Sequence, residues 1–118
     1  MTYDVYDLYR QAQQRLADRE AFAAIPLLEL AAAQLPKDRA ILRLLALAYF
    51  DAGAVAAAES TLRVLVDQDP LDADALHMLG QTLERNGRSA EAGRYLSLAA
   101  GLDPSYSVSC STWGGGPV

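Results

Sequence analysis

Cysteine, histidine and tryptophan each occur only once in this 118-residue chain, as Cys110, His77 and Trp113. A single cysteine cannot form a disulfide within the chain, and it cannot build a cysteine-based metal site alone. The sequence also lacks a glycine-rich phosphate loop and any cluster of His, Cys and Asp at metal-ligand spacing. We therefore expect no cofactor, no metal site at His77 and no enzymatic activity.

Positive charge and long apolar runs are also scarce. The formal net charge is −5, so a sequence-independent grip on nucleic acid or on an anionic membrane is not expected. No apolar run approaches the roughly 18 residues that a membrane-spanning helix needs. The first residues, MTYDVYDLYRQAQQ, lack the basic-then-apolar pattern of a signal peptide. These features favour a soluble cytoplasmic protein that binds neither nucleic acid nor membranes.

What is abundant is alanine and leucine. Hydrophobic residues make up 52% of the chain, which excludes a chain that is disordered as a whole. β-Branched residues are scarce before the last dozen positions, so helix propensity dominates. The composition predicts an all-α domain that is long enough to bury a core.

A period of 34 residues organises the chain. Pro36, Pro70 and Pro104 recur at this interval, and a fixed period of 20–50 residues indicates a solenoid of repeats. The second and third units also share identical residues at equivalent positions. These pairs are Leu42/Leu76, Leu45/Leu79, Gly53/Gly87, Ala56/Ala90, Ala58/Ala92, Leu62/Leu96, Asp69/Asp103 and Pro70/Pro104.

Each unit reads as two helices joined by a turn. Asp38 and Asp72 precede helical runs and are predicted N-caps, and Ser89 is a third candidate cap. Gly53 and Gly87 follow the first helix of their units, where a left-handed residue is favoured. The second helices end before Asp-Pro, because proline disfavours a helical residue ahead of it. The predicted helices span residues 4–17, 20–34, 39–52, 54–67, 73–86 and 90–102.

This pattern resembles the tetratricopeptide repeat family, in which small and large apolar residues alternate at fixed helical positions. The first unit matches less well, because Gln11 and Arg15 stand at apolar positions and Arg19 replaces the turn glycine. In the second unit, Leu65 stands where a small residue is usual. The matching residues are Leu76, Leu79, Gly80, Leu83, Ala92, Leu96, Ala99 and Pro104 in the third unit, Leu42, Leu45, Ala46, Tyr49, Ala58, Leu62 and Pro70 in the second, and Leu8, Ala12, Ala24, Leu28, Ala31 and Pro36 in the first.

The resemblance implies a right-handed α-solenoid of three helix-turn-helix repeats, at about residues 5–36, 39–70 and 73–104, followed by a tail at 105–118. It also gives a reason for Gly80, a residue that costs about 1 kcal/mol relative to alanine within a helix. The small pair Gly80 and Ala92 would let two helices approach closely. Pro26, which lies inside the second helix, is tolerable if that helix begins near Phe22.

In this family the ligand usually lies on the concave face, which the first helix of each unit lines. The corresponding partner-binding residues would be Tyr6, Tyr9, Gln13, Arg43, Leu47, Phe50, His77, Gln81 and Glu84. Aromatic side chains with a few polar anchors suit a peptide. Alternatively, Leu47 and Phe50 pack against neighbouring helices, His77 is a surface residue without a task, and the two tyrosines belong to a ragged end.

Some relatives clamp acidic C-terminal tails with basic and amide side chains. The corresponding positions here hold Tyr9, Gln13, Leu44, Asp74 and Met78. Because the basic side chains are missing, we do not expect this chain to bind such tails.

The sequence changes character after Pro104, with SYSVSCSTWGGGPV. Serine, valine and glycine are poor helix formers, and the alternation of serine with Tyr106, Val108 and Cys110 is typical of an extended segment. Three interpretations remain open. The segment could be a free tail, it could dock in a groove through Tyr106, Val108 and Trp113, or it could be a substrate for modification.

The sequence as a whole favours a protein–protein interaction scaffold that binds a peptide or helix of another protein. One alternative is a self-associating module, or homo-oligomer, whose tail docks in its own or a neighbour's groove. A precursor with a modified Ser/Cys-rich tail is the alternative from another class.

Overall fold

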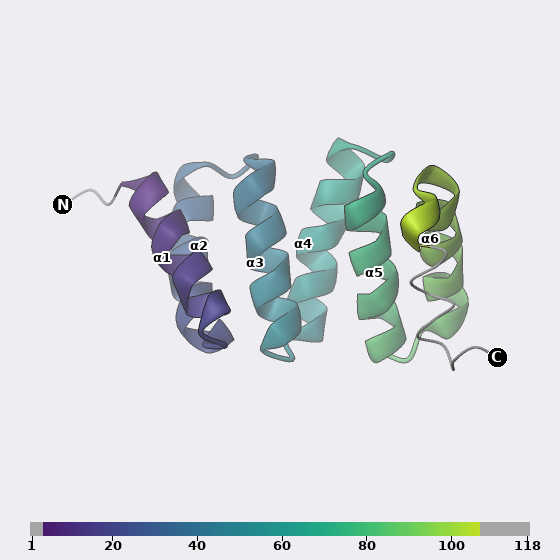
Figure 1. Cartoon of the computed structure of the whole chain (residues 1–118), viewed down its shortest axis with the longest axis horizontal. Helices are drawn as coiled ribbons and strands as arrows, with labels where there is room; N and C mark the ends of the chain where they lie inside the picture. The colour runs from purple at the N-terminus through teal and green to yellow at the C-terminus, as the bar shows by residue number, and fades with distance from the viewer. Residues whose placement is uncertain (1–3, 107–118) are drawn as a thin grey trace.

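The computed structural model describes residues 4–106, and these form six α-helices that stand side by side in antiparallel pairs (Figure 1). Within this range the chain has no β-strand. The prediction of an all-α solenoid of helix-turn-helix units is therefore confirmed. The helices are α1 (Val5–Ala17), α2 (Ala21–Gln34), α3 (Arg39–Asp51), α4 (Val55–Gln68), α5 (Ala73–Arg85) and α6 (Ser89–Leu102).

The turn that follows each first helix has one shared geometry. Gly53 and Gly87 adopt positive φ angles of 81° and 78°, as predicted, and Arg19 adopts the same left-handed conformation with a φ of 63°. In each turn the N–H of the next residue donates to a carbonyl five residues earlier, as Ala54 does to Tyr49 at 2.8 Å. This is the bond of a Schellman motif, which glycine adopts without a steric penalty.

Two of the predicted N-caps are confirmed. Asp38 Oδ1 accepts from the N–H of Ile41 at 3.1 Å, and Asp72 Oδ1 accepts from the N–H of Ala75 at 3.2 Å. The expectation for Ser89 is wrong, because Arg88 is the N-cap residue of α6 and Ser89 is its first helical residue. The turn between α5 and α6 therefore spans residues 86–88, one position earlier than the predicted turn at 87–89.

Leucine and alanine side chains fill the layer between the helices. The largest buried cluster joins α3 and α4 to α5 and α6, and it includes Leu62, Leu79 and Leu83. Each fully buried leucine contributes about 1.5–3 kcal/mol. Because every cluster draws on two neighbouring helix pairs, the repeats stabilise one another as in other solenoids.

Gly80 lies where α5 and α6 approach closely. A Cβ atom at this position would lie 2.6 Å from Leu96 Cγ and 3.3 Å from the carbonyl oxygen of Ala92. The first distance is too short for two carbon atoms. The contact explains why a glycine stands within this helix, and it supports the predicted pairing with Ala92.

Pro26 lies inside α2, which begins one residue before Phe22 and one residue after the predicted start. Because α2 begins at Ala21, proline occupies the sixth helical position and removes a bond that would otherwise reach the carbonyl of Phe22. Phe22 and Pro26 are both exposed, so water can reach this end of the helix.

Charged side chains connect the second and third units. Arg63 of α4 donates to Glu91 of α6 at 2.9 Å, and Arg88 donates to Glu59 at 2.9 Å. Burial alone would raise the pKa of Glu59, but its bonds to Arg63 and the charge of Arg88 hold the pKa below its ordinary value. Glu59 and Arg63 belong to α4 and Glu91 to α6, and Arg88 is the N-cap residue of α6.

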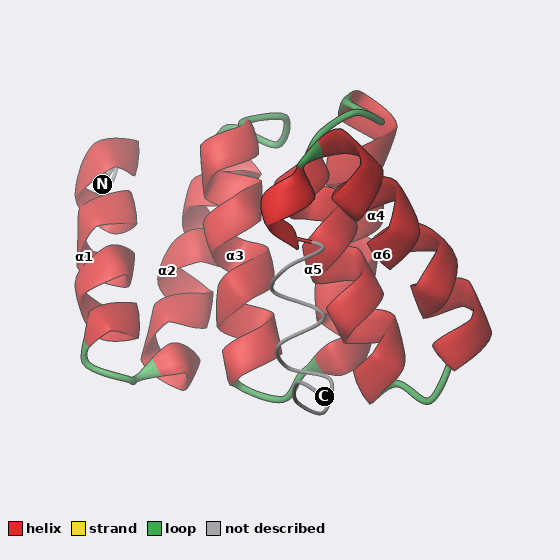
Figure 2. Ribbon diagram, turned by 45° about the vertical axis from the view of Figure 1, so that its right-hand side comes forward, coloured by secondary structure: helices red, strands yellow, loops and turns green. Residues whose placement is uncertain are grey.

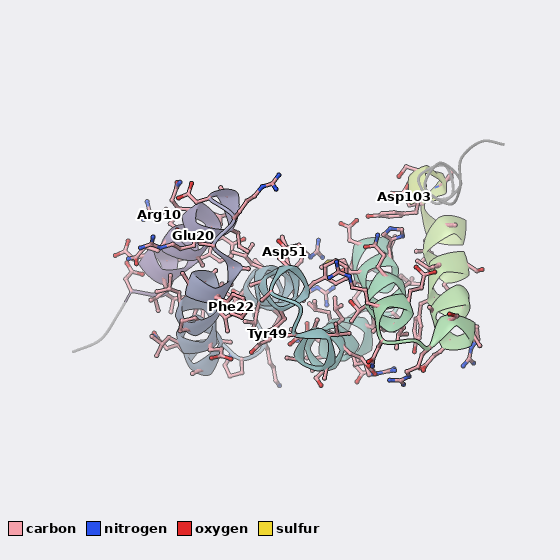
Figure 3. All side chains as sticks on the ribbon, turned by 90° about the horizontal axis from the view of Figure 1, so that it is seen from below. Arg10, Glu20, Phe22, Tyr49, Asp51 and Asp103 are labelled. Atoms are coloured by element: carbon pink, nitrogen blue, oxygen red, sulfur yellow. The ribbon has the colours of Figure 1, made fainter. Side chains whose placement is uncertain are left out.

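The molecule is elongated, with principal extents of 54 × 28 × 24 Å. Seen along the helices, the chain curves, so that α1 and the turn at Asp103 form two rims and α3 lies deeper between them (Figure 3). The first helices of the units line this hollow side. No helix among the described residues is both long and apolar enough to cross a lipid bilayer.

The start of the C-terminal segment differs from our expectation. Residues 104–106 continue as a short helical turn rather than as an extended strand. Asp103 caps this turn, because its Oδ1 accepts from the N–H of Ser105 at 3.1 Å. Val108 and Trp113, which we proposed as docking residues, lie outside the described residues.

Candidate functional site

A groove of about 700 Å³ crosses the hollow side of the molecule. Side chains of α1, α3 and α5 line it, together with the turn at residues 104–106. Its volume falls within the range of about 300–1,000 Å³ that is typical of ligand pockets. The lining residues are Tyr9, Arg39, Ala40, Arg43, Leu44, Leu47, Asp74, His77, Met78 and Tyr106.

Four of the nine predicted partner-binding residues meet in this groove. Tyr9 comes from α1, Arg43 and Leu47 come from α3, and His77 comes from α5. Tyr9, Arg43 and His77 share a face because they stand one 34-residue period apart, and Leu47 lies one helical turn after Arg43. The side chain of Leu47 is 37% exposed, so a large part of its apolar surface is available to a ligand.

Tyr6 lines a smaller pocket beside the groove. This pocket holds about 170 Å³ between the start of α1 and the start of α3, with Leu35 and Ile41 on its other sides. Tyr9 and Ala40 line both cavities. The two hollows therefore form one surface that runs from Tyr6 toward α5.

The remaining four predicted residues do not line either cavity. Gln13, Gln81 and Glu84 are at least partly exposed on α1 and α5. Phe50 is only partly exposed, and the guanidinium carbon of Arg85 lies 4.2 Å from the centre of its ring. Arg85 also donates to the carbonyl of Phe50 at 3.0 Å, which already accepts from the N–H of Gly53 at 3.1 Å, so it adds a second bond at the end of α3.

A charged network forms one wall of the groove. Asp72, which caps α5, also accepts from Arg39 and from Arg43, whose Nη2 lies 2.6 Å from Asp72 Oδ2. Arg43 Nη1 lies 3.3 Å from Asp74 Oδ2. Each arginine on this wall thus faces a carboxylate, so the groove has little excess charge to offer a ligand.

The protonation of Asp72 follows from these partners. Burial alone would raise the pKa of this carboxyl. The N–H of Ala75 and the guanidinium groups of Arg39 and Arg43 overcome that effect, and the pKa lies below its ordinary value. Asp72 therefore stays ionised well below neutral pH.

His77 and Tyr106 close the groove at its C-terminal side. Their rings are stacked, with centroids 4.4 Å apart and planes inclined by 24°. Burial lowers the pKa of His77, although the charges of Asp74 and Glu84 oppose this shift. The imidazole Nδ1 is buried and has no hydrogen-bond partner among residues 4–106.

Several lining residues were not among the predicted partner-binding set. Leu44, Asp74 and Met78 stand at the clamp positions that we had assigned to a different class of ligand. Arg39 was missed, although it lies one helical turn before Arg43 and the spacing could have indicated it. Within residues 4–106, no group of three His, Cys, Asp or Glu side chains could hold a metal ion.

The groove thus combines apolar side chains in its middle with paired charges on one wall and stacked rings at one end. It holds no arrangement of a nucleophile with a general base among the residues that line it. Its chemistry suits binding of a segment of another molecule.

The fold agrees with that of solved helical-repeat proteins. YrrB, described as a tetratricopeptide repeat protein with an unusual peptide-binding site, is 20% identical, with a TM-score of 0.82, over 87% of this chain and 53% of that chain. MamA from Desulfovibrio magneticus RS-1 is 26% identical, with a TM-score of 0.76, over 83% of this chain and 55% of that chain. An O-GlcNAc transferase mutant of Thermobaculum terrenum is 24% identical, with a TM-score of 0.77, over 90% of this chain and 21% of that chain.

The chain spans little more than half the length of the MamA and YrrB structures that it resembles. No curated protein sequence matches it. The tetratricopeptide repeat pattern itself matches residues 15–81, which is more than half of the chain. Such repeats generally mediate protein–protein interaction, and on this match the chain belongs to the tetratricopeptide repeat family.

Proposed function

We propose that this protein is an interaction scaffold whose concave groove binds a peptide or helical segment of another protein. The observation that carries the proposal is the groove of about 700 Å³, which extends over the first helices of all three units. Its exposed apolar side chains, Leu47 above all, would gain from burial by a ligand.

The groove favours a ligand of low charge. Arg43 is already engaged by Asp72 and Asp74, and Arg39 by Asp72. A carboxylate of a ligand would have to compete with these carboxylates for the same guanidinium groups. An apolar segment can instead bury surface against Leu44, Leu47 and Met78 without breaking an ion pair.

The pocket beside Tyr6 gives the ligand a second point of contact. Its volume of about 170 Å³ suits one apolar side chain rather than a whole peptide. Tyr6 is 75% exposed and Leu35 is 44% exposed, so both would be covered when this pocket is filled. A ligand that reaches from Met78 to Tyr6 would contact all three units.

The structural relatives support the same activity. YrrB is a repeat protein with a peptide-binding site by its own description, and its fold matches that of this chain. The proposed partner is therefore another protein, bound without a cofactor and without catalysis.

Selection from a random peptide display library tests this proposal. The full chain is immobilised, and the enriched peptides are measured for affinity to the wild type, to Leu47→Glu and to Leu30→Glu. Leu30 is the matched control, because it is 46% exposed on α2, outside the groove. We expect Leu47→Glu to weaken binding at least tenfold, because it replaces the exposed apolar surface of the groove by a charged side chain that ligand binding would desolvate, and Leu30→Glu to have no effect.

Two results would contradict the proposal. One is the enrichment of no peptide at all. The other is the enrichment of peptides that bind Leu47→Glu as tightly as they bind the wild type. Circular dichroism of each variant confirms that loss of binding does not reflect loss of helices.

A further inference from the structure

The helical turn at residues 104–106 makes a contact with α5 that corresponds to an ion pair one repeat earlier, but with two aromatic rings in place of the two charges. Tyr106 follows Asp72 by one repeat period, and His77 follows Arg43 by the same period. Arg43 pairs with Asp72 between the second and third units, and His77 stacks on Tyr106 at the end of the third. The turn thus brings the chain back to the side of the first helices. A fourth repeat unit would begin its own first helix at this place.

The geometry of this turn places the departing chain at the groove. Figures 1 and 2 both show the last helical turn on the α5 side of α6. Tyr106 is itself a lining residue of the groove, and its ring is half-buried against His77. One side chain of the C-terminal segment therefore already occupies part of the proposed ligand site.

The composition of residues 107–118 matches the groove. The segment SVSCSTWGGGPV carries no charged side chain and places Val108, Cys110 and Trp113 among small polar residues. The groove offers apolar surface with its own charges already paired, so an uncharged segment leaves those pairs intact. The serine hydroxyls could also donate to the imidazole Nδ1 of His77, which has no partner within the described part of the chain.

The length of the segment is sufficient. Twelve residues in an extended conformation span up to roughly 40 Å. The longest dimension of the described molecule is 54 Å, and the groove occupies only part of it. The segment can therefore reach from Tyr106 to α1 without unfolding any helix.

We propose that residues 107–118 are an intramolecular ligand of the concave groove, which a partner protein must displace. The proposal rests on the proposed peptide-binding role of the groove and names its resident occupant. Tyr106 anchors the segment at the His77 end, and the apolar residues that follow cover Leu44, Leu47 and Met78. The occupant lowers the apparent affinity for any outside ligand, because only the fraction of molecules with an open groove can bind it.

Cys110 provides a direct test, because it is the single cysteine of the chain. A nitroxide spin label attached to it broadens the nuclear magnetic resonance signals of nearby amides in the isotopically labelled full-length protein. We expect strong loss of intensity at the amides of Leu44, Leu47 and Met78, and none at Leu30. The substitution Leu47→Glu should restore the intensities at Leu44 and Met78.

A mixing experiment distinguishes a segment bound in its own groove from a segment bound in the groove of a second molecule. Isotope-labelled protein without spin label is combined with spin-labelled protein without isotope. Broadening of the groove in this mixture would show that the segment enters a neighbour's groove, and it would overturn the proposal. Broadening centred on Gly93 and Leu98 of α6, or broadening of no amide in particular, would overturn it as well.

Trp113 gives a second measurement without a label, because it is the single tryptophan. Its fluorescence emission should lie at shorter wavelength in the wild type than in Leu47→Glu or Tyr106→Ala, and equal emission in all three would contradict docking. Tyr106→Ala should also tighten the binding of a display-selected peptide several-fold. If such peptides bind the groove but Tyr106→Ala leaves their affinity unchanged, the intramolecular ligand fails while the peptide-binding function stands.

Discussion

The boundary between the second and third units differs from the two ends of the molecule. At the inner boundary, Asp72 caps α5 and pairs with two arginines of α3. At the N-terminal end, Arg19 adopts the left-handed conformation that Gly53 and Gly87 adopt in the other two units. At the C-terminal end, an aromatic stack of His77 and Tyr106 replaces the ion pair. The inner boundary is thus held by ion pairs and a helix cap, whereas the ends carry a left-handed non-glycine residue and a half-buried aromatic contact.

The largest effect is expected at Asp72. The change Asp72→Ala removes an N-cap and leaves Arg39 and Arg43 without their shared carboxylate, so we expect a loss of about 2–3 kcal/mol in the free energy of unfolding. Urea denaturation followed by circular dichroism measures it. Asp38→Ala is the matched control, since Asp38 is the equivalent cap one repeat earlier, and it should cost about 1 kcal/mol. Equal losses in the two variants would show that the arginines contribute nothing.

The close approach of α5 and α6 gives the next effect. In Gly80→Ala, the gain in helix propensity of about 1 kcal/mol is outweighed by the contact with Leu96 and the Ala92 carbonyl, for a net loss of about 1–2 kcal/mol. Gly93→Ala is the control within α6, because an added Cβ meets no atom within 4 Å. This control should be stabilised by up to about 1 kcal/mol. Stabilisation of both variants to the same degree would contradict the packing account.

The strained turn at the N-terminal end should be improvable. Arg19→Gly removes the cost of a left-handed non-glycine residue, and we expect a gain of about 0.5–1 kcal/mol after the entropy of glycine is included. A thermal melt of the variant beside the wild type measures it. Lys37→Gly, at an exposed site outside the helices, controls for a general effect of glycine. A destabilised Arg19→Gly variant would contradict this account of strain at Arg19.

The smallest effect concerns pH. Burial lowers the pKa of His77 in the folded state, so the unfolded chain binds a proton more readily. Stability is therefore complete above the unfolded pKa of about 6.5 and falls as the pH drops through the window below it. For Asp72, whose folded pKa is also lowered, the loss begins only below about pH 4. In His77→Gln, the midpoint of urea unfolding should depend less on pH between pH 7 and 5 than it does in the wild type. An unchanged dependence of the midpoint on pH would contradict this assignment.

The sequence predicted the fold well because its signals are local and repeated. The turn residues Gly53 and Gly87 and the caps Asp38 and Asp72 each act within a few residues of their own position, and the 34-residue period repeats these signals along the chain. Gly80 was interpretable because the same position holds a small residue in the preceding unit. Local chemistry of this kind fixes helix ends without knowledge of the whole structure.

The site was only partly predictable, because it depends on how side chains from different units meet. The register identified the hollow side through Tyr9, Arg43, Leu47 and His77. It could not show that Arg85 lies over the ring of Phe50, since that contact depends on how α3 and α5 are placed relative to each other. It also missed the helical turn at 104–106, because the Asp103 cap outweighs the poor helix propensity of Ser105.

Mapping the bound ligand on the protein tests the central claim most directly. A peptide selected against the full chain is titrated into the isotope-labelled protein, and the shift of each backbone amide signal is recorded. The account predicts that the largest shifts lie at Leu44, Leu47 and Met78 on the first helices. Shifts confined to Leu30, Val64 and Leu98 on the second helices would contradict it, because the ligand would then lie on the opposite side of the molecule.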